Sequence, residues 1–219
     1  MEHLNDNILC VVDVETTGPT PRYHDILEVC VMPLDKLLKP SRDYMPFCMN
    51  LVPMRIENID HEALRMQRKD IMDVIKHKVC WNKERLVDIT LSGCEPSRAA
   101  DLFVEWYEKL QLLPFKRIMP IAHNWCFDRE FLIDWLGYST FDLCFDPRYR
   151  DTMVYSLYDN DIAGWHGHDF PYPKNNLAYV CQKLGIPHER AHSALDDCVS
   201  TAKAYRQMVS DALRYGPAK

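Results

Sequence analysis

The sequence has no long apolar segment, no paired-cysteine motif and no excess of positive charge. Its apolar runs all fall short of the roughly 20 residues that a transmembrane helix needs, so we expect no membrane association. The first residues lack a basic stretch followed by an apolar one, which argues against a signal peptide. A net charge of −6 argues against a broad basic surface for duplex nucleic acid, although bound metal ions could supply positive charge in a narrow site.

The cysteines predict free thiols rather than disulfide bonds. Their number, nine, is odd, and neither a Cys-x-x-Cys pair nor a zinc-type spacing of cysteine and histidine occurs. Cys10, Cys30, Cys181 and Cys198 lie within apolar segments, where buried thiols are common. Free buried thiols are typical of a reducing compartment, and we therefore expect a cytoplasmic protein.

Two carboxylates stand two residues apart at the end of an apolar run. Residues 8–14 predict a buried strand, and Glu15 follows it directly. Asp13 and Glu15 would point to the same face, because side chains at positions i and i+2 of a strand do so. Buried carboxylates side by side repel each other unless a cation lies between them. The pair therefore predicts a divalent metal site.

The order of the predicted elements indicates an α/β fold, with a mixed central sheet flanked by helices. We predict strands at 8–14, 26–32, about 44–51 and 118–122. We predict helices at 98–113, 125–136, 152–158, 176–184 and 193–214, with weaker helical patterns at 62–68 and 69–77. The rest of 138–174 is expected to form loops. No repeat or change of composition marks a second domain, so residues 1–219 are expected to form one domain with an insertion-like segment at about 39–97.

Helical periodicity selects a third acid. In the helix predicted after the fourth strand, Asp128 is in phase with the large apolar residues Phe131 and Leu132. Glu130 and Asp134 lie on the opposite side of the same helix. An acid in a first helical turn is also favoured by the helix dipole alone, but its phase with apolar residues indicates that Asp128 faces the core.

Two adjacent aspartates in the last predicted helix face in different directions. Asp196 and Asp197 are about 100° apart around the helix axis. Asp197 shares its stripe with small residues such as Ala194, which let the helix approach the sheet, whereas Asp196 shares with Ser200 a polar stripe that we expect to face solvent. We therefore predict that Asp197 faces inward and that Asp196 is a surface acid. His192 precedes this helix and is either a polar helix-entry residue or a functional group beside Asp197.

These residues resemble the motifs of the DEDDh 3′–5′ exonucleases, which belong to the ribonuclease H-like superfamily. Residues 13–18, Asp-Val-Glu-Thr-Thr-Gly, resemble the first motif, and residues 122–128, Ala-His-Asn-Trp-Cys-Phe-Asp, resemble the second. Residues 151–152 and then 192–197, with a His-x-x-x-x-Asp spacing, resemble the third region. Glu28 also matches an acid that is common in the family. The motifs stand in the order and at the spacing of the family.

The resemblance implies a ribonuclease H-like fold and a metal-dependent hydrolase that releases nucleoside 5′-monophosphates from a 3′ end. Asp13 would bridge two Mg²⁺ or Mn²⁺ ions, with Glu15 and Asp197 on the first ion. Asp128 would hold the second ion, partly through water. His192 would take the proton from the attacking water.

The resemblance also implies substrate contacts. Thr16, Thr17 and the neighbouring backbone would lie beside the 3′-terminal nucleotide. Asn124 either contacts substrate or orients its loop, and Phe127 either stacks on a base or belongs to the core. His123 is interpretable as a structural residue or as a phosphate-facing one.

The expected partner is a single-stranded or frayed 3′ end of DNA or RNA, because a pocket with carboxylates around metals admits one unpaired nucleotide more readily than a duplex. The choice between DNA and RNA depends on contacts to the 2′-hydroxyl, which the sequence does not identify. Some members of the family act as dimers, so a homodimer is one of the oligomeric states that the resemblance allows.

Two other interpretations start from the same residues. If the protein were a catalytically weak module that binds nucleic acid or a protein partner, we would expect one of the four acids or the histidine to be lost. All five are present: Asp13, Glu15, Asp128, Asp197 and His192. Structural acids neutralised by buried Arg or Lys predict basic residues on the buried faces. The stripes that contain Asp128 and Asp197 carry none.

Overall fold

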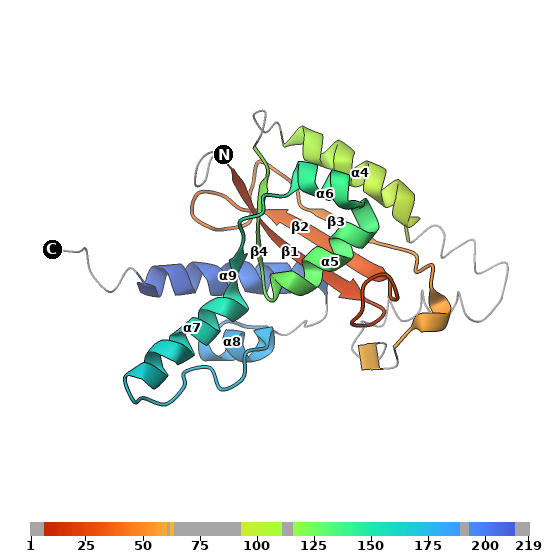
Figure 1. Ribbon diagram of the computed structural model, residues 1–219. Coiled ribbons are helices and arrows are strands. Elements are labelled where there is room, and N and C mark those ends of the chain that lie inside the picture. Colours follow the sequence, from red (N-terminus) through yellow and green to blue (C-terminus); the bar gives the residue numbers. More distant parts are fainter. Residues whose placement is uncertain (1–6, 61, 64–92, 111–115, 189–192, 213–219) are drawn as a thin grey trace.

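The computed structural model describes residues 7–60, 62–63, 93–110, 116–188 and 193–212, and its centre is a five-stranded sheet (Figure 1). The strands are β1 (Ile8–Thr16), β2 (Ile26–Pro33), β3 (Phe47–Asn50), β4 (Ile118–Ala122) and β5 (Arg150–Asp151). Their order is β3-β2-β1-β4-β5. The first three strands are antiparallel, whereas β4 and β5 run parallel to β1. The predicted mixed α/β sheet is confirmed.

Helices cover both faces of the sheet (Figure 1). One face carries α4 (Pro96–Lys109), α5 (Trp125–Leu136) and α6 (Tyr138–Cys144). The other face carries α9 (Ala194–Ala212), which contacts α7 (Thr152–Trp165) and α8 (Leu177–Lys183). A 3-10 helix, η1, spans Ile56–Asn58. No helix in the described ranges is long and apolar enough to cross a membrane.

The alternation of β1 side chains decides where its acids lie. Val12 and Val14 belong to the core under α4, α5 and α6, whereas Val11 packs in the core under α9. Because successive strand side chains point to opposite faces, Asp13 and Glu15 continue the face that α9 covers. The acids therefore lie at the C-terminal end of the central strand, beside the start of α9.

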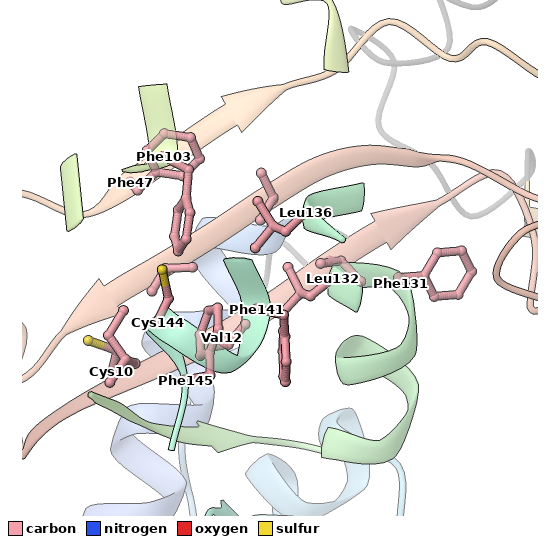
Figure 2. Packing of buried hydrophobic residues seen from close by; sticks show 14 of the residues in the cluster. Cys10, Val12, Phe47, Phe103, Phe131, Leu132, Leu136, Phe141, Cys144 and Phe145 are labelled. Carbon is pink, nitrogen blue, oxygen red and sulfur yellow. The ribbon is translucent and has the colours of Figure 1, made fainter. Parts of the chain in front are cut away.

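A layer of aromatic rings joins α4 and α5 to the sheet (Figure 2). Phe103 of α4 meets Phe47 of β3 edge-on at 5.3 Å and stacks on Phe145 at 5.8 Å. Phe145 in turn lies 6.0 Å from Trp125, the first residue of α5. Aromatic pairs of this kind contribute about 0.5–1.5 kcal/mol each beyond their burial. This packing fixes the N-terminal turn of α5, which carries Asp128.

Asp151 connects β5 to the starts of two helices. Its carboxylate accepts hydrogen bonds from the backbone N–H groups of Asn124 at 3.0 Å and Trp125 at 2.8 Å, where α5 begins. It also accepts one from Met153 at 2.9 Å, in the first turn of α7. A buried carboxylate at two helix N-termini satisfies donors that would otherwise be unpaired, and both helix dipoles favour it.

Most predicted elements agree with the structure. The strand at 118–122 and the helix at 125–136 have the predicted bounds, and the helix at 152–158 extends to Trp165. The expectation of loops at 138–144 is wrong, because α6 occupies these residues. This helix has seven residues and buries only Phe141 and Cys144, too few positions to show a period.

Several predictions concern residues that lie partly or wholly outside the described ranges. The helical pattern at 69–77 lies outside the described residues, and the one at 62–68 is described only at 62–63, which are helical. The single-domain organisation stays a prediction, since residues 64–92 also lie outside the described part. Eight cysteines are described and all eight are free thiols, as expected.

Cys30 and Cys48 face each other across β2 and β3. The N–H of Leu51 donates to the carbonyl oxygen of Leu27 at 2.8 Å, which makes these two residues a hydrogen-bonded pair. Because such pairs alternate along an antiparallel ladder, Cys30 and Cys48 form a non-hydrogen-bonded pair, whose side chains lie closest together. Their Sγ atoms are 2.8 Å apart.

This register predicts that a mild thiol oxidant, diamide, joins Cys30 to Cys48 in the folded protein. Peptide mapping by mass spectrometry after alkylation of the remaining thiols would detect the link, and Cys48→Ser should abolish it. A register shifted by one residue would place the two thiols on opposite faces of the sheet. Complete oxidation of other thiols without this link would therefore contradict the register.

Candidate active site

Three carboxylates meet where β1 ends and α9 begins. One ligand oxygen each from Asp13, Glu15 and Asp197 lies within 4.8 Å of the others. Glu15 is 8% exposed and Asp197 is 9% exposed. The strand supplies two acids two residues apart, and the first turn of α9 supplies the third. A set of carboxylate oxygens at this spacing fits a divalent cation.

Asp128 approaches the same place from the first turn of α5. Its Oδ1 accepts a hydrogen bond at 3.0 Å from the backbone N–H of Val14, the residue between the two strand acids. The side chain is buried, as its helical phase predicted. The structure thus brings all four predicted metal ligands to one end of β1, with Asp128 beside the tight group of three.

The electrostatics of this acid cluster favour a bound cation. Burial raises the pKa of Asp13 well above its usual range, and the charges of Asp128 and Asp197 raise it further. Burial likewise raises the pKa of Asp128, although the hydrogen bond from Val14 opposes that shift. Crowded carboxylates disfavour their own ionisation, and a divalent cation among them would remove that cost.

Glu28 on β2 is a further acid beside the cluster, opposite Glu15 on β1. The two residues are directly opposite each other in the β1–β2 register, so their side chains share a face. Glu28 is buried, and its charge is one of those that raise the pKa of Asp13. The resemblance had indicated an acid here, and the structure places it next to the cluster.

A cavity of about 360 Å³ opens beside the acid cluster. Its lining includes Glu15, Thr16, Asp60 and Phe127. Its volume lies within the range of pockets that hold small organic ligands. Gly18 also lines the cavity, and a Cβ at this position would clash with the ring of His24. Of the five predicted substrate-contacting residues, Thr16 and Phe127 therefore reach this cavity.

The other three predicted substrate-contacting residues, Thr17, His123 and Asn124, make contacts within the fold. His123 uses both ring nitrogens within the fold: Nδ1 is 2.9 Å from Thr152 Oγ1, and Nε2 donates to the carbonyl oxygen of Asn175 at 2.8 Å. Burial is the main cause that lowers the pKa of His123. These contacts correspond to the structural interpretation of this histidine.

Thr17 and Asn124 also shape loops. Thr17 Oγ1 accepts a hydrogen bond at 2.9 Å from the N–H of Asp25, which closes the β1–β2 connection. Asn124 precedes α5 with a φ of 77°, in the left-handed region, where asparagine is tolerated better than most residues. Asn124 thus turns the chain from β4 into the helix that carries Asp128.

His192 lies outside the described residues, so its predicted role stays a prediction. Sequence reasoning missed a different histidine, His188, whose Nε2 lies 3.6 Å from Asp197 Oδ1. Its Nδ1 lies 3.0 Å from Ser200 Oγ. The placement of Ser200 on a solvent face is wrong: it is 5% exposed, because the segment after α8 covers that side of α9. The sequence did offer a signal for His188, because it is a second histidine close to residues 192–197.

No family model matches the sequence, and no curated protein matches it either. Solved structures share its fold. The chain aligns over 94% of its length with cell-death related nuclease 4 (CRN-4), at a TM-score of 0.63 and 15% identity, and covers 64% of that chain. It aligns over 95% with the zinc-bound E. coli ExoI–ssDNA complex, at a TM-score of 0.65 and 14% identity, and covers 41% of that chain.

The nuclease domain of 3′hExo, a DEDDh family member bound to rAMP, gives a TM-score of 0.60 at 15% identity. Here the alignment covers 94% of this chain and 92% of that one, whereas the chain spans less than two thirds of CRN-4 and of ExoI. The fold is that of the DEDDh exonucleases. Within this DEDDh fold, the acid cluster lies at the end of the central strand.

The raised pKa of Asp13 predicts a destabilising effect on the metal-free protein. An acid whose pKa is higher in the folded protein than in the unfolded chain lowers stability as the pH rises above the unfolded value of about 4, and the loss is complete above the folded pKa. Asp13→Asn should therefore raise the melting temperature of EDTA-treated protein at pH 8. The gain should be roughly 2–4 °C for each kcal/mol of repulsion removed, and it should shrink toward pH 4.

Differential scanning fluorimetry between pH 4 and pH 8 measures this difference. Asp196→Asn, which removes a more exposed acid from the same helix, serves as the matched control and should change the melting temperature little. An Asp13→Asn protein that melts at or below the wild-type temperature at pH 8 would show that the cluster is not under electrostatic strain.

Proposed function

We propose that this protein is a metal-dependent 3′–5′ exonuclease that acts on single-stranded or frayed nucleic acid. It hydrolyses the phosphodiester bond at the 3′ end and releases a nucleoside 5′-monophosphate. The observation that carries this proposal is the convergence of Asp13, Glu15 and Asp197, with Asp128 beside them, next to a cavity that Glu15 lines. The fold shared with known exonucleases adds independent support.

The donor set suits Mg²⁺ or Mn²⁺, because carboxylate oxygens are the ligands that these hard cations prefer. Asp13, Glu15 and Asp197 would hold one ion, and Asp128 together with Asp13 would hold a second. When bound, two such ions polarise the scissile phosphate and lower the pKa of the attacking water. His192 would accept the proton of that water.

The cavity residues would hold the terminal nucleotide. Phe127 is half-buried, packs on Phe131 at 5.0 Å and still lines the cavity, so it can offer part of its ring to a base. Stacking on an aromatic ring is worth about 1–3 kcal/mol per base and tolerates any base. The N–H of Asp60, which also lines the cavity, donates to the carbonyl oxygen of Thr17 at 2.8 Å, and Thr17 directly follows β1.

The direct test is digestion of single-stranded DNA, single-stranded RNA and duplex DNA, each labelled at the 5′ or the 3′ end, in Mg²⁺ or Mn²⁺. The proposal predicts immediate release of labelled mononucleotide from 3′-labelled strands and a ladder of shortening products from 5′-labelled strands. Release of mononucleotides first from the 5′ end, or cleavage only into internal fragments, would overturn the proposed polarity.

Asp196 and Asp197 point in different directions from α9, and this difference gives a sharper prediction. Asp197→Asn should lower the rate by more than about 100-fold, because it removes a metal ligand and not merely a partner of one. Asp196→Asn, the matched control, should stay near the wild-type rate, since Asp196 is not part of the tight group of carboxylates. Equal losses in the two variants would contradict the assignment of Asp197 as the metal ligand.

A further inference from the structure

His188 lies in the segment between α8 and α9 and reaches one side of the acid cluster. Its Nε2 is 3.6 Å from Asp197 Oδ1, and its Nδ1 is 3.0 Å from Ser200 Oγ. Asp197 and Ser200 are three residues apart on α9 and therefore share a helix face. The histidine side chain is 8% exposed.

The backbone that leads to His188 is held against α8. The N–H of Ile186 donates to the carbonyl oxygen of Cys181 at 2.9 Å, and Gly185 adopts a φ of 68°, which glycine reaches without strain. Ile186 packs on the buried cluster that contains Val180 and Ala204, which joins α8 to α9. This packing fixes the backbone two residues before His188, and the imidazole contacts Asp197 and Ser200 on α9.

The contact with Ser200 can decide which nitrogen of His188 carries the proton. When the Ser200 hydroxyl donates to Nδ1, the proton of the neutral ring is on Nε2 and points toward Asp197. At 3.6 Å the two atoms are in contact but are too far apart for a good hydrogen bond. A shift of a few tenths of an ångström would complete it.

We propose that His188, oriented by Ser200, is a positioning residue of the metal centre. It holds one oxygen of the Asp197 carboxylate and leaves the other oxygen to a bound metal ion. Carboxylates that bind metals are commonly fixed in this way by a hydrogen-bonding partner, and loss of that partner typically costs 10- to 100-fold in metal affinity or activity. The expected effect of His188 on catalysis rests on the proposed function. Its expected effect on metal binding is independent of that function.

This role differs from those of the two other histidines near the site. His123 has its two ring nitrogens in contact with Thr152 and Asn175. His192 is the proton acceptor of the proposed function. His188 touches neither water nor substrate in this proposal and acts only through Asp197.

The test measures Mn²⁺ binding without substrate, by electron paramagnetic resonance titration. His188→Leu keeps the bulk of the side chain and removes its donor, so Mn²⁺ affinity should fall by about 10- to 100-fold. His188→Gln keeps an N–H donor at a similar reach and should bind Mn²⁺ more tightly than the leucine variant. Ser200→Ala should weaken binding by a smaller factor, and the exposed His166→Leu is the matched control.

Wild-type Mn²⁺ affinity in a folded His188→Leu protein would overturn the proposal. Equal weakening in the leucine and glutamine variants would also overturn it, because packing alone would then explain the effect. Circular dichroism reports whether each variant folds. If His188→Leu does not fold, Ser200→Ala decides, and wild-type affinity in that variant would overturn the proposal.

The nuclease assay separates positioning from a role in the chemical step. His188→Leu should raise the Mg²⁺ concentration that gives half the maximal rate, while the rate at saturating Mg²⁺ returns close to that of the wild type. A lower rate at saturating Mg²⁺ with an unchanged Mg²⁺ requirement would contradict positioning. If the wild-type protein has no nuclease activity, the proposed function fails, but the Mn²⁺ titration still decides the role of His188.

Discussion

Repulsion among crowded carboxylates at the end of β1 is the constraint on which the rest of the site depends. Asp13 and Glu15 must share a face because they are two residues apart on a strand, and α9 adds Asp197 to the same place. Such a group is costly in a folded protein unless a cation offsets it. A divalent cation among the three carboxylates would offset that cost, and this is the basis of the metal-binding account.

The scaffold holds these acids in place from several directions. The aromatic layer from Phe47 to Trp125 fixes the start of α5, and Asp151 completes the hydrogen bonds of the same helical turn. Asp128 then reaches back to the backbone of Val14. One consequence is that residues outside the acid cluster, Asp151 above all, act on the site by placing the helix that carries Asp128.

Local periodicity accounts for what could be predicted from the sequence. Strand alternation is enough to bring Asp13 and Glu15 together, and helical phase separates Asp128 and Asp197 from their acidic neighbours. The same reasoning missed α6, which has seven residues, and β5, which has two, because neither is long enough to show a period. It also misplaced Ser200 and passed over His188, since their contact depends on the path of the chain between α8 and α9, which no periodicity records.

The central claim is that the carboxylates at the end of β1 bind divalent cations. Anomalous diffraction from crystals grown with Mn²⁺ tests it most directly, because manganese can then be located independently of the protein atoms. The account predicts manganese between Asp13, Glu15 and Asp197, with a second ion beside Asp128. Saturated crystals that show no manganese at these carboxylates, or show it only elsewhere on the molecule, would contradict it.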